Sequence, residues 1–106
     1  MAVNSDRTTV LEYIRALAAA PRPELEDVER TLTDGYAHAL SLEAERLRLQ
    51  RQLEQRAVEL PNAPADGVAE ITGLARGLAE TDGELTELRA ALALLRETAQ
   101  RIRAAA

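Results

Sequence analysis

The sequence has no cysteine, tryptophan, phenylalanine or lysine, and it has a single histidine in 106 residues. The lack of cysteine excludes disulfide bonds and thiolate chemistry. The only aromatic residues are Tyr13 and Tyr36, so a thick globular core would be difficult to build. Neither a glycine-rich phosphate loop nor a serine nucleophile motif occurs. We therefore expect no enzyme activity and no cofactor.

Long hydrophobic runs are also missing. No apolar segment approaches the roughly 20 residues that a membrane-spanning helix needs. The first residues do not combine a basic region with an apolar run, so no signal peptide is expected. The net charge of −5 disfavours nucleic acid as a partner, because the nucleic acid backbone is itself anionic. These features predict a soluble, cytoplasmic protein that binds neither membranes nor nucleic acid.

Residues that favour long helices dominate what is present. Ala, Leu, Glu, Arg and Gln are abundant, and 29% of the residues are charged, as is typical of coiled coils. Prolines and turn residues divide the chain into one domain of three predicted helices, at about 6–20, 24–60 and 67–103. The turn between the last two helices is predicted at 61–67.

Individual residues set the predicted helix ends. Ser5 or Asp6, with Thr8 as an alternative, is the predicted cap of the first helix, and Asp66 is the predicted cap of the third. Gly35 lies inside the second helix and weakens one turn by about 1 kcal/mol relative to alanine. Because the apolar periodicity continues in phase on both sides of Gly35, we predict one unbroken helix.

Apolar residues recur at heptad spacing in both long helices, which indicates a coiled coil. A short turn makes the two helices antiparallel neighbours, with facing residues whose numbers sum to about 127. Arg46 and Arg56 interrupt the core positions of the second helix, and this register brings them near Asp82 and Glu70. The predicted fold is all-α: an antiparallel two-helix coiled-coil hairpin with a short N-terminal helix, dimerising into a helical bundle.

The second helix carries a further apolar stripe, here called the outer stripe: Tyr36, Leu40, Ala44 and Leu47. The first helix is about 22 Å long, at 1.5 Å per residue, and is predicted to cover the second helix only as far as Tyr36 to Leu40. Apolar residues beyond that point would stay exposed, including Val58, Leu94 and the pair at 90–91. A homodimer that covers this surface is therefore predicted. Its predicted interface comprises Tyr36, Leu40, Ala44, Leu47, Val58 and Leu94.

Two polar groups suggest other functions. Arg46, Arg48, Arg51 and Arg56 form a basic stretch that could bind an anionic, nucleotide-like ligand, although interleaved acidic residues favour ion pairing instead. Asp34 and His38 lie four residues apart on one helical face, with Glu45 two turns further on. A polar patch is the favoured interpretation, because a metal site needs three or four converging ligands. The favoured function is a non-enzymatic protein–protein interaction module that acts as an adaptor, regulator or small chaperone. Its expected partners are a second copy of the chain and another protein. The alternatives are a ligand-gated regulator at the arginines, an enzyme or metal protein, and a piece of a larger assembly.

Overall fold

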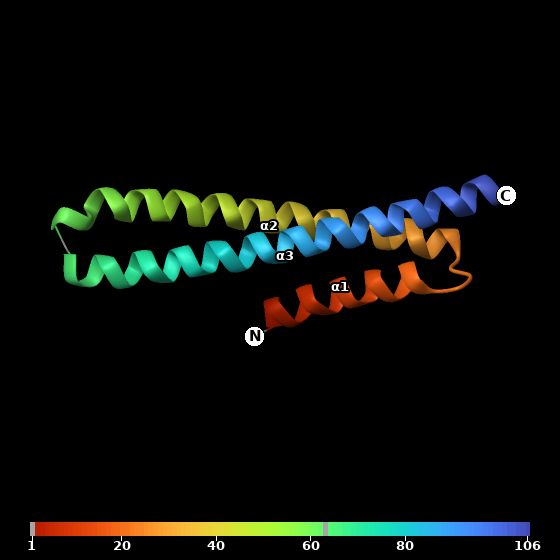
Figure 1. The fold of residues 1–106 in the computed structure, drawn as a ribbon, viewed down its shortest axis with the longest axis horizontal. Coiled ribbons are helices and arrows are strands. Elements are labelled where there is room, and N and C mark those ends of the chain that lie inside the picture. The colour runs from red at the N-terminus through yellow and green to blue at the C-terminus, as the bar shows by residue number, and fades with distance from the viewer. Residues whose placement is uncertain (1, 63) are drawn as a thin grey trace. The chain divides into compact units, whose positions relative to one another are not determined.

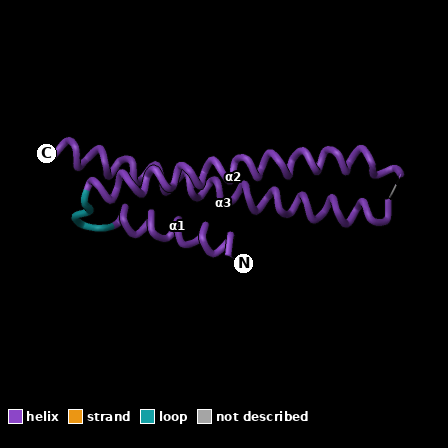
Figure 2. Tube along the Cα trace, turned by 180° about the vertical axis from the view of Figure 1, so that it is seen from behind, coloured by secondary structure: helices purple, strands orange, loops and turns teal. Residues whose placement is uncertain are grey.

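The computed structural model describes residues 2–62 and 64–106, and for residues 2–9 it describes the course of the backbone without the side chains. Three α-helices account for nearly all of this chain: α1 (Ala2–Ala19), α2 (Leu25–Glu59) and α3 (Pro64–Ala105). A 3-10 turn, η1 (Leu60–Asn62), follows α2. No strand occurs in the described ranges, as expected for an all-α protein (Figure 2).

Proline explains most of the helix ends. The helix α1 stops at Ala19, two residues before Pro21, whose ring would clash with the preceding turn. The start of α2 is fixed by a hydrogen bond from the Val28 backbone N–H to the Glu24 carbonyl. Glu26 and Asp27 place negative charge in its first turn, where the helix dipole favours it. The observed bounds of α2 differ from the predicted ones by one residue at each end.

The start of α3 differs from the prediction. The helix begins at Pro64 and not near Gly67, so Asp66 lies in its first turn and does not cap it. Proline suits the first helical position because its missing N–H would have no partner there. The helix α1 also begins earlier than predicted, at Ala2. Ser5, Asp6 and Thr8 were predicted as caps, and their side chains lie outside the described part of the chain.

The chain forms two compact units. The first comprises Met1–Leu40 and Thr86–Ala106 and is called the three-helix unit, because it contains α1 together with parts of α2 and α3. The second comprises Ser41–Leu85 and is called the hairpin unit, because it contains only the remaining parts of α2 and α3. The prediction of an unbroken α2 is confirmed, since the helix continues through Gly35.

In the three-helix unit, α1 packs against α2 and α3 (Figures 1 and 2). Ile14 of α1 and Leu95 of α3 are both fully buried. A Cβ placed on Gly35 would lie 3.0 Å from Ile14 Cδ1 and would overlap Leu92 Cδ2, so the three helices meet at this glycine. The buried apolar core of this unit comprises Ile14, Val28, Ala39, Leu88, Ala91, Leu92, Leu95 and Ala99.

The hairpin unit pairs α2 and α3 in the predicted antiparallel register (Figure 1). Arg46 Nε lies 3.3 Å from Asp82 Oδ1, and Arg56 Nε lies 2.8 Å from Glu70 Oε2. Both predicted ion pairs are therefore confirmed. Opposite charges on facing helices help to select this register, since a shift along the helices would separate the arginines from their carboxylates.

Candidate functional site

The outer stripe of α2 is the largest group of exposed apolar side chains that the helix presents. Tyr36 is 41% exposed, Leu40 is 66% exposed and Leu47 is 47% exposed, and Ala44 between them is exposed as well. Val58, at 79% exposure, follows on the same helical face.

The position of α1 explains why the stripe begins so early along α2. The helix α1 was predicted to cover α2 no further than Tyr36 to Leu40, and both of these side chains, which belong to the predicted interface, are exposed. Ile14 of α1 packs at Gly35, and Thr31, one turn earlier, is also buried. In an α-helix, residues 31 and 35 share one edge, whereas residues 36 and 40 project from the other edge. Covering the first edge therefore leaves the outer stripe in contact with solvent.

On α3 the sequence predicted Leu94 as part of the interface and the pair at 90–91 as exposed. Leu94 is 57% exposed, but it follows Leu92 by two positions and precedes the fully buried Leu95. It therefore points away from the core, on the outer side of α3. Ala91 was expected to be exposed and is 4% exposed, because it lies in the core of the three-helix unit. The three-helix unit therefore buries part of the α3 surface that the sequence pattern predicted to be exposed.

The four candidate anion-binding arginines do not converge on a common point. Arg46 and Arg56 pair with carboxylates of α3, and Arg56 also contacts Glu59 at 3.0 Å. Arg48 Nη2 lies 3.9 Å from Glu45 within α2. Arg51 alone forms no ion pair in the part of the chain that the structure describes. The helical positions of the four arginines point in different directions, so they do not form a cradle for one anion.

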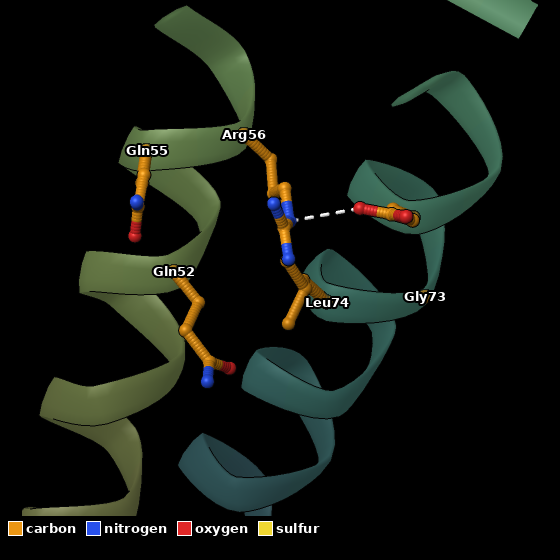
Figure 3. Close-up of a pocket in the computed structure, with 6 residues that line it drawn as sticks. Gln52, Gln55, Arg56, Gly73 and Leu74 are labelled. Atoms are coloured by element: carbon orange, nitrogen blue, oxygen red, sulfur yellow. Dashed lines mark ion pairs between the residues drawn. The ribbon is translucent and has the colours of Figure 1, made fainter. Parts of the chain in front are cut away.

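A surface pocket of about 430 Å³ lies on the hairpin unit between α2 and α3 (Figure 3). The ion pair between Arg56 and Glu70 crosses the pocket, and the remaining lining is uncharged. It is lined by Gln52, Gln55, Arg56, Glu70, Gly73 and Leu74. Within the pocket the charges of Arg56 and Glu70 are paired with each other.

Within residues 2–62 and 64–106, no three side chains of the His, Cys, Asp or Glu type come close enough to hold a metal ion together. The described helices include none that combines the length and hydrophobicity required to cross a lipid bilayer. All buried side-chain polar atoms in this part of the chain have a hydrogen-bond partner.

Comparison of this chain with protein family models, curated proteins and solved structures found no match in any of the three. The candidate site therefore has to be interpreted from its own geometry. That geometry consists of exposed apolar residues along one face of α2, next to side chains whose charges are largely paired.

Proposed function

We propose that this chain is a non-enzymatic protein–protein interaction module that works through helix–helix contacts and forms a homodimer. The observation that carries the proposal is the exposure of Tyr36, Leu40, Ala44 and Leu47 at consecutive turns of one helical face. Apolar residues scattered singly on a surface need no explanation. A continuous series of them on a stable helix is typical of a surface that packs against another helix.

The charge distribution supports a protein partner over an anionic polymer. The hairpin unit contains nine acidic residues and five arginines, so its formal charge is negative. A negative surface repels phosphate groups, whereas it does not oppose the burial of an apolar stripe against another protein. Adaptor, regulator and small chaperone are the roles consistent with such a module. The expected further protein partner and the cytoplasmic location stay predictions.

Light scattering coupled to gel filtration at micromolar concentration tests the proposal. The monomer mass is 11.5 kDa, and we expect about twice this mass in solution. The substitution Leu47→Glu should return the mass to that of the monomer, because a buried unpaired carboxylate is strongly unfavourable. Circular dichroism should show that the variant remains helical.

Leu94→Glu is the matched control for Leu47→Glu. It makes the same chemical change at a leucine of similar exposure, 57% against 47%, on the outer side of α3. The control should remain dimeric. A monomeric wild-type protein would overturn the proposed homodimer, and a dimer split by Leu94→Glu alone would move the interface to α3.

A further inference from the structure

The hairpin unit lacks the third helix that completes the packing of the three-helix unit. In the three-helix unit, α1 packs against α2 and α3 and places Ile14 in the core (Figure 1). In the hairpin unit, Leu53 and Leu74 face each other in the antiparallel register, yet both remain partly exposed. Two packed helices leave a groove on each side of their line of contact, and a third helix fills such a groove in helical bundles.

The pocket of the hairpin unit lies in one of these grooves, here called the pocket groove. Gln52, Gln55 and Arg56 border it from α2, and Gly73 and Leu74 border it from α3 (Figure 3). A Cβ added to Gly73 would meet nothing within 4 Å, so this wall is open to a close neighbour. The partly exposed Leu74 is an apolar side chain that a partner can bury. The volume of about 430 Å³ is large enough for apolar side chains of a partner to enter.

The edge of the pocket groove carries more carboxylates than guanidinium groups. Arg56 Nη1 lies 3.0 Å from Glu59 Oε2, and Arg56 Nε lies 2.8 Å from Glu70 Oε2, so one guanidinium serves two carboxylates. The whole hairpin unit, with nine acidic residues and five arginines, is also negative. Basic side chains of a partner are therefore favoured beside the groove. The hairpin unit of a second copy is equally negative and gains no charge complementarity there.

The helical surface also favours one mode of binding. An extended peptide binds through backbone hydrogen bonds to the edge of a sheet, and the described residues contain no strand. A helix needs only a groove that accepts apolar side chains spaced three or four residues apart. The exposed amides of Gln52 and Gln55 each offer a donor and an acceptor to polar groups beside that apolar stripe.

We propose that the pocket groove binds an amphipathic helix of another protein, with one apolar stripe and basic residues along its flanks. The proposal rests on the proposed interaction module and adds the chemistry of its protein partner. Apolar side chains of the bound helix enter the pocket beside Gly73 and Leu74. A lysine or arginine next to them contacts Glu59 or Glu70. The bound helix thereby supplies the hairpin unit with a third helix.

Binding of a designed peptide to the full chain tests the proposal. The probe, called the lysine peptide, is a fluorescently labelled helix of about 18 residues with leucine on one face and lysine on the other. Fluorescence anisotropy at physiological ionic strength should show saturable binding of one peptide per chain. A control peptide with glutamate in place of lysine should bind roughly tenfold more weakly or worse, because like charges repel. Equal affinities of the two peptides, or no binding of the lysine peptide, would overturn the proposal.

Two glycine variants locate the bound peptide. Gly73→Leu places a side chain in the pocket and should weaken binding of the lysine peptide roughly tenfold or more, because it occupies the space that the peptide needs. Gly83→Leu is the matched control, since an added Cβ at Gly83 also meets nothing within 4 Å and Gly83 does not line the pocket. The control should bind like the natural chain, and circular dichroism should show that both variants remain helical. Equal effects of the two substitutions would contradict binding in the pocket groove.

Site-specific labelling gives a second measurement, since the natural chain has no cysteine. Gln55→Cys carries an environment-sensitive dye at the pocket, and Gln50→Cys carries the same dye at another exposed glutamine of α2. Helical spacing turns position 50 away from the edge that bears position 55. The lysine peptide should shift the emission of the dye at position 55 to shorter wavelength and leave the dye at position 50 unchanged. A shift at position 50 without one at position 55 would overturn the proposal.

Light scattering of the natural chain separates failure of the pocket groove from failure of the homodimer. A dimeric protein that does not bind the lysine peptide contradicts the pocket groove and leaves the homodimer standing. A monomeric protein whose peptide binding is weakened by Gly73→Leu, and not by Gly83→Leu, supports the pocket groove and overturns only the homodimer. A monomeric protein that binds no peptide overturns both.

Discussion

The three-helix unit and the hairpin unit are built from the same two helices, yet they differ in how much they bury. In the three-helix unit, α1 covers one side of the α2–α3 pair, and side chains such as Ile14 and Leu95 are fully buried. Among the hairpin-unit side chains that the structure describes, only Leu42, Thr81 and Leu85 are buried, and Leu53 and Leu74 stay partly exposed. Two helices alone cannot enclose the residues between them, so a third helix or another chain is needed.

Gly35, Gly73 and Gly83 show the same difference. At Gly35, in the three-helix unit, an added Cβ would overlap the end of the Leu92 side chain, so Leu92 would have to shift to admit it. At Gly73 and Gly83, in the hairpin unit, an added Cβ would meet nothing within 4 Å. Dense packing requires the first glycine, whereas nothing within the hairpin unit requires the other two.

The largest expected effect is from removing the side chain that attaches α1. Ile14→Ala deletes a fully buried side chain, and we expect a loss of about 2–5 kcal/mol in the free energy of unfolding. Urea unfolding followed by circular dichroism measures this loss. Val58→Ala is the control, because Val58 is 79% exposed and should change stability by less than about 0.5 kcal/mol. Similar losses of stability for both variants would contradict the difference in burial between the three-helix unit and the hairpin unit.

Gly35→Ala should be the next largest change. Overpacking typically costs about 1–3 kcal/mol, while alanine gains about 1 kcal/mol in helix propensity, so a net destabilisation is expected. The measurement is again urea unfolding. The double variant Gly35→Ala with Leu92→Ala should lose less stability than the sum of the single variants, because the shortened residue 92 makes room for the new Cβ. Strict additivity would show that the two residues are not in contact.

The hairpin glycines should respond in the opposite direction. Gly73→Ala and Gly83→Ala are each expected to stabilise the protein by about 0.5–1 kcal/mol, since alanine favours the helix and meets open space. Thermal unfolding of the two variants should show higher melting temperatures. A lower melting temperature for either variant would mean that another chain or helix packs closely on that glycine.

The smallest effect is expected at the half-exposed ion pairs of the hairpin unit. Arg46 and Asp82 have side chains that are 45% and 51% exposed, so solvent screens their attraction. Arg46→Leu should change the free energy of unfolding by less than about 1 kcal/mol, and it should be neutral or slightly stabilising. A loss well above this value in urea unfolding would indicate that the pair is buried in an assembly.

Much of the architecture could be predicted from local patterns. Pro21, Pro61 and Pro64 mark the interruptions between helices, because a proline ring is incompatible with a helix interior. The heptads and the arginines at positions 46 and 56 predicted which residues of α2 and α3 face each other. For the candidate site, exposure of the outer stripe was predictable from the presence of a second apolar face on α2. The earlier start of α3 was missed because Asp66 is a good cap, while Pro64 is an equally suitable first helical residue.

The amino-acid sequence by itself determined the helices, their antiparallel register and the existence of an unpaired apolar face, because these follow from residue spacing along a helix and from opposite charges. Only the tertiary structure decided which edge of α2 receives α1, and with it which apolar side chains remain exposed. That choice depends on the fit of Ile14 into the space beside Gly35 and Leu92. Such a fit is a property of three surfaces in contact, and no periodicity within a single helix specifies it.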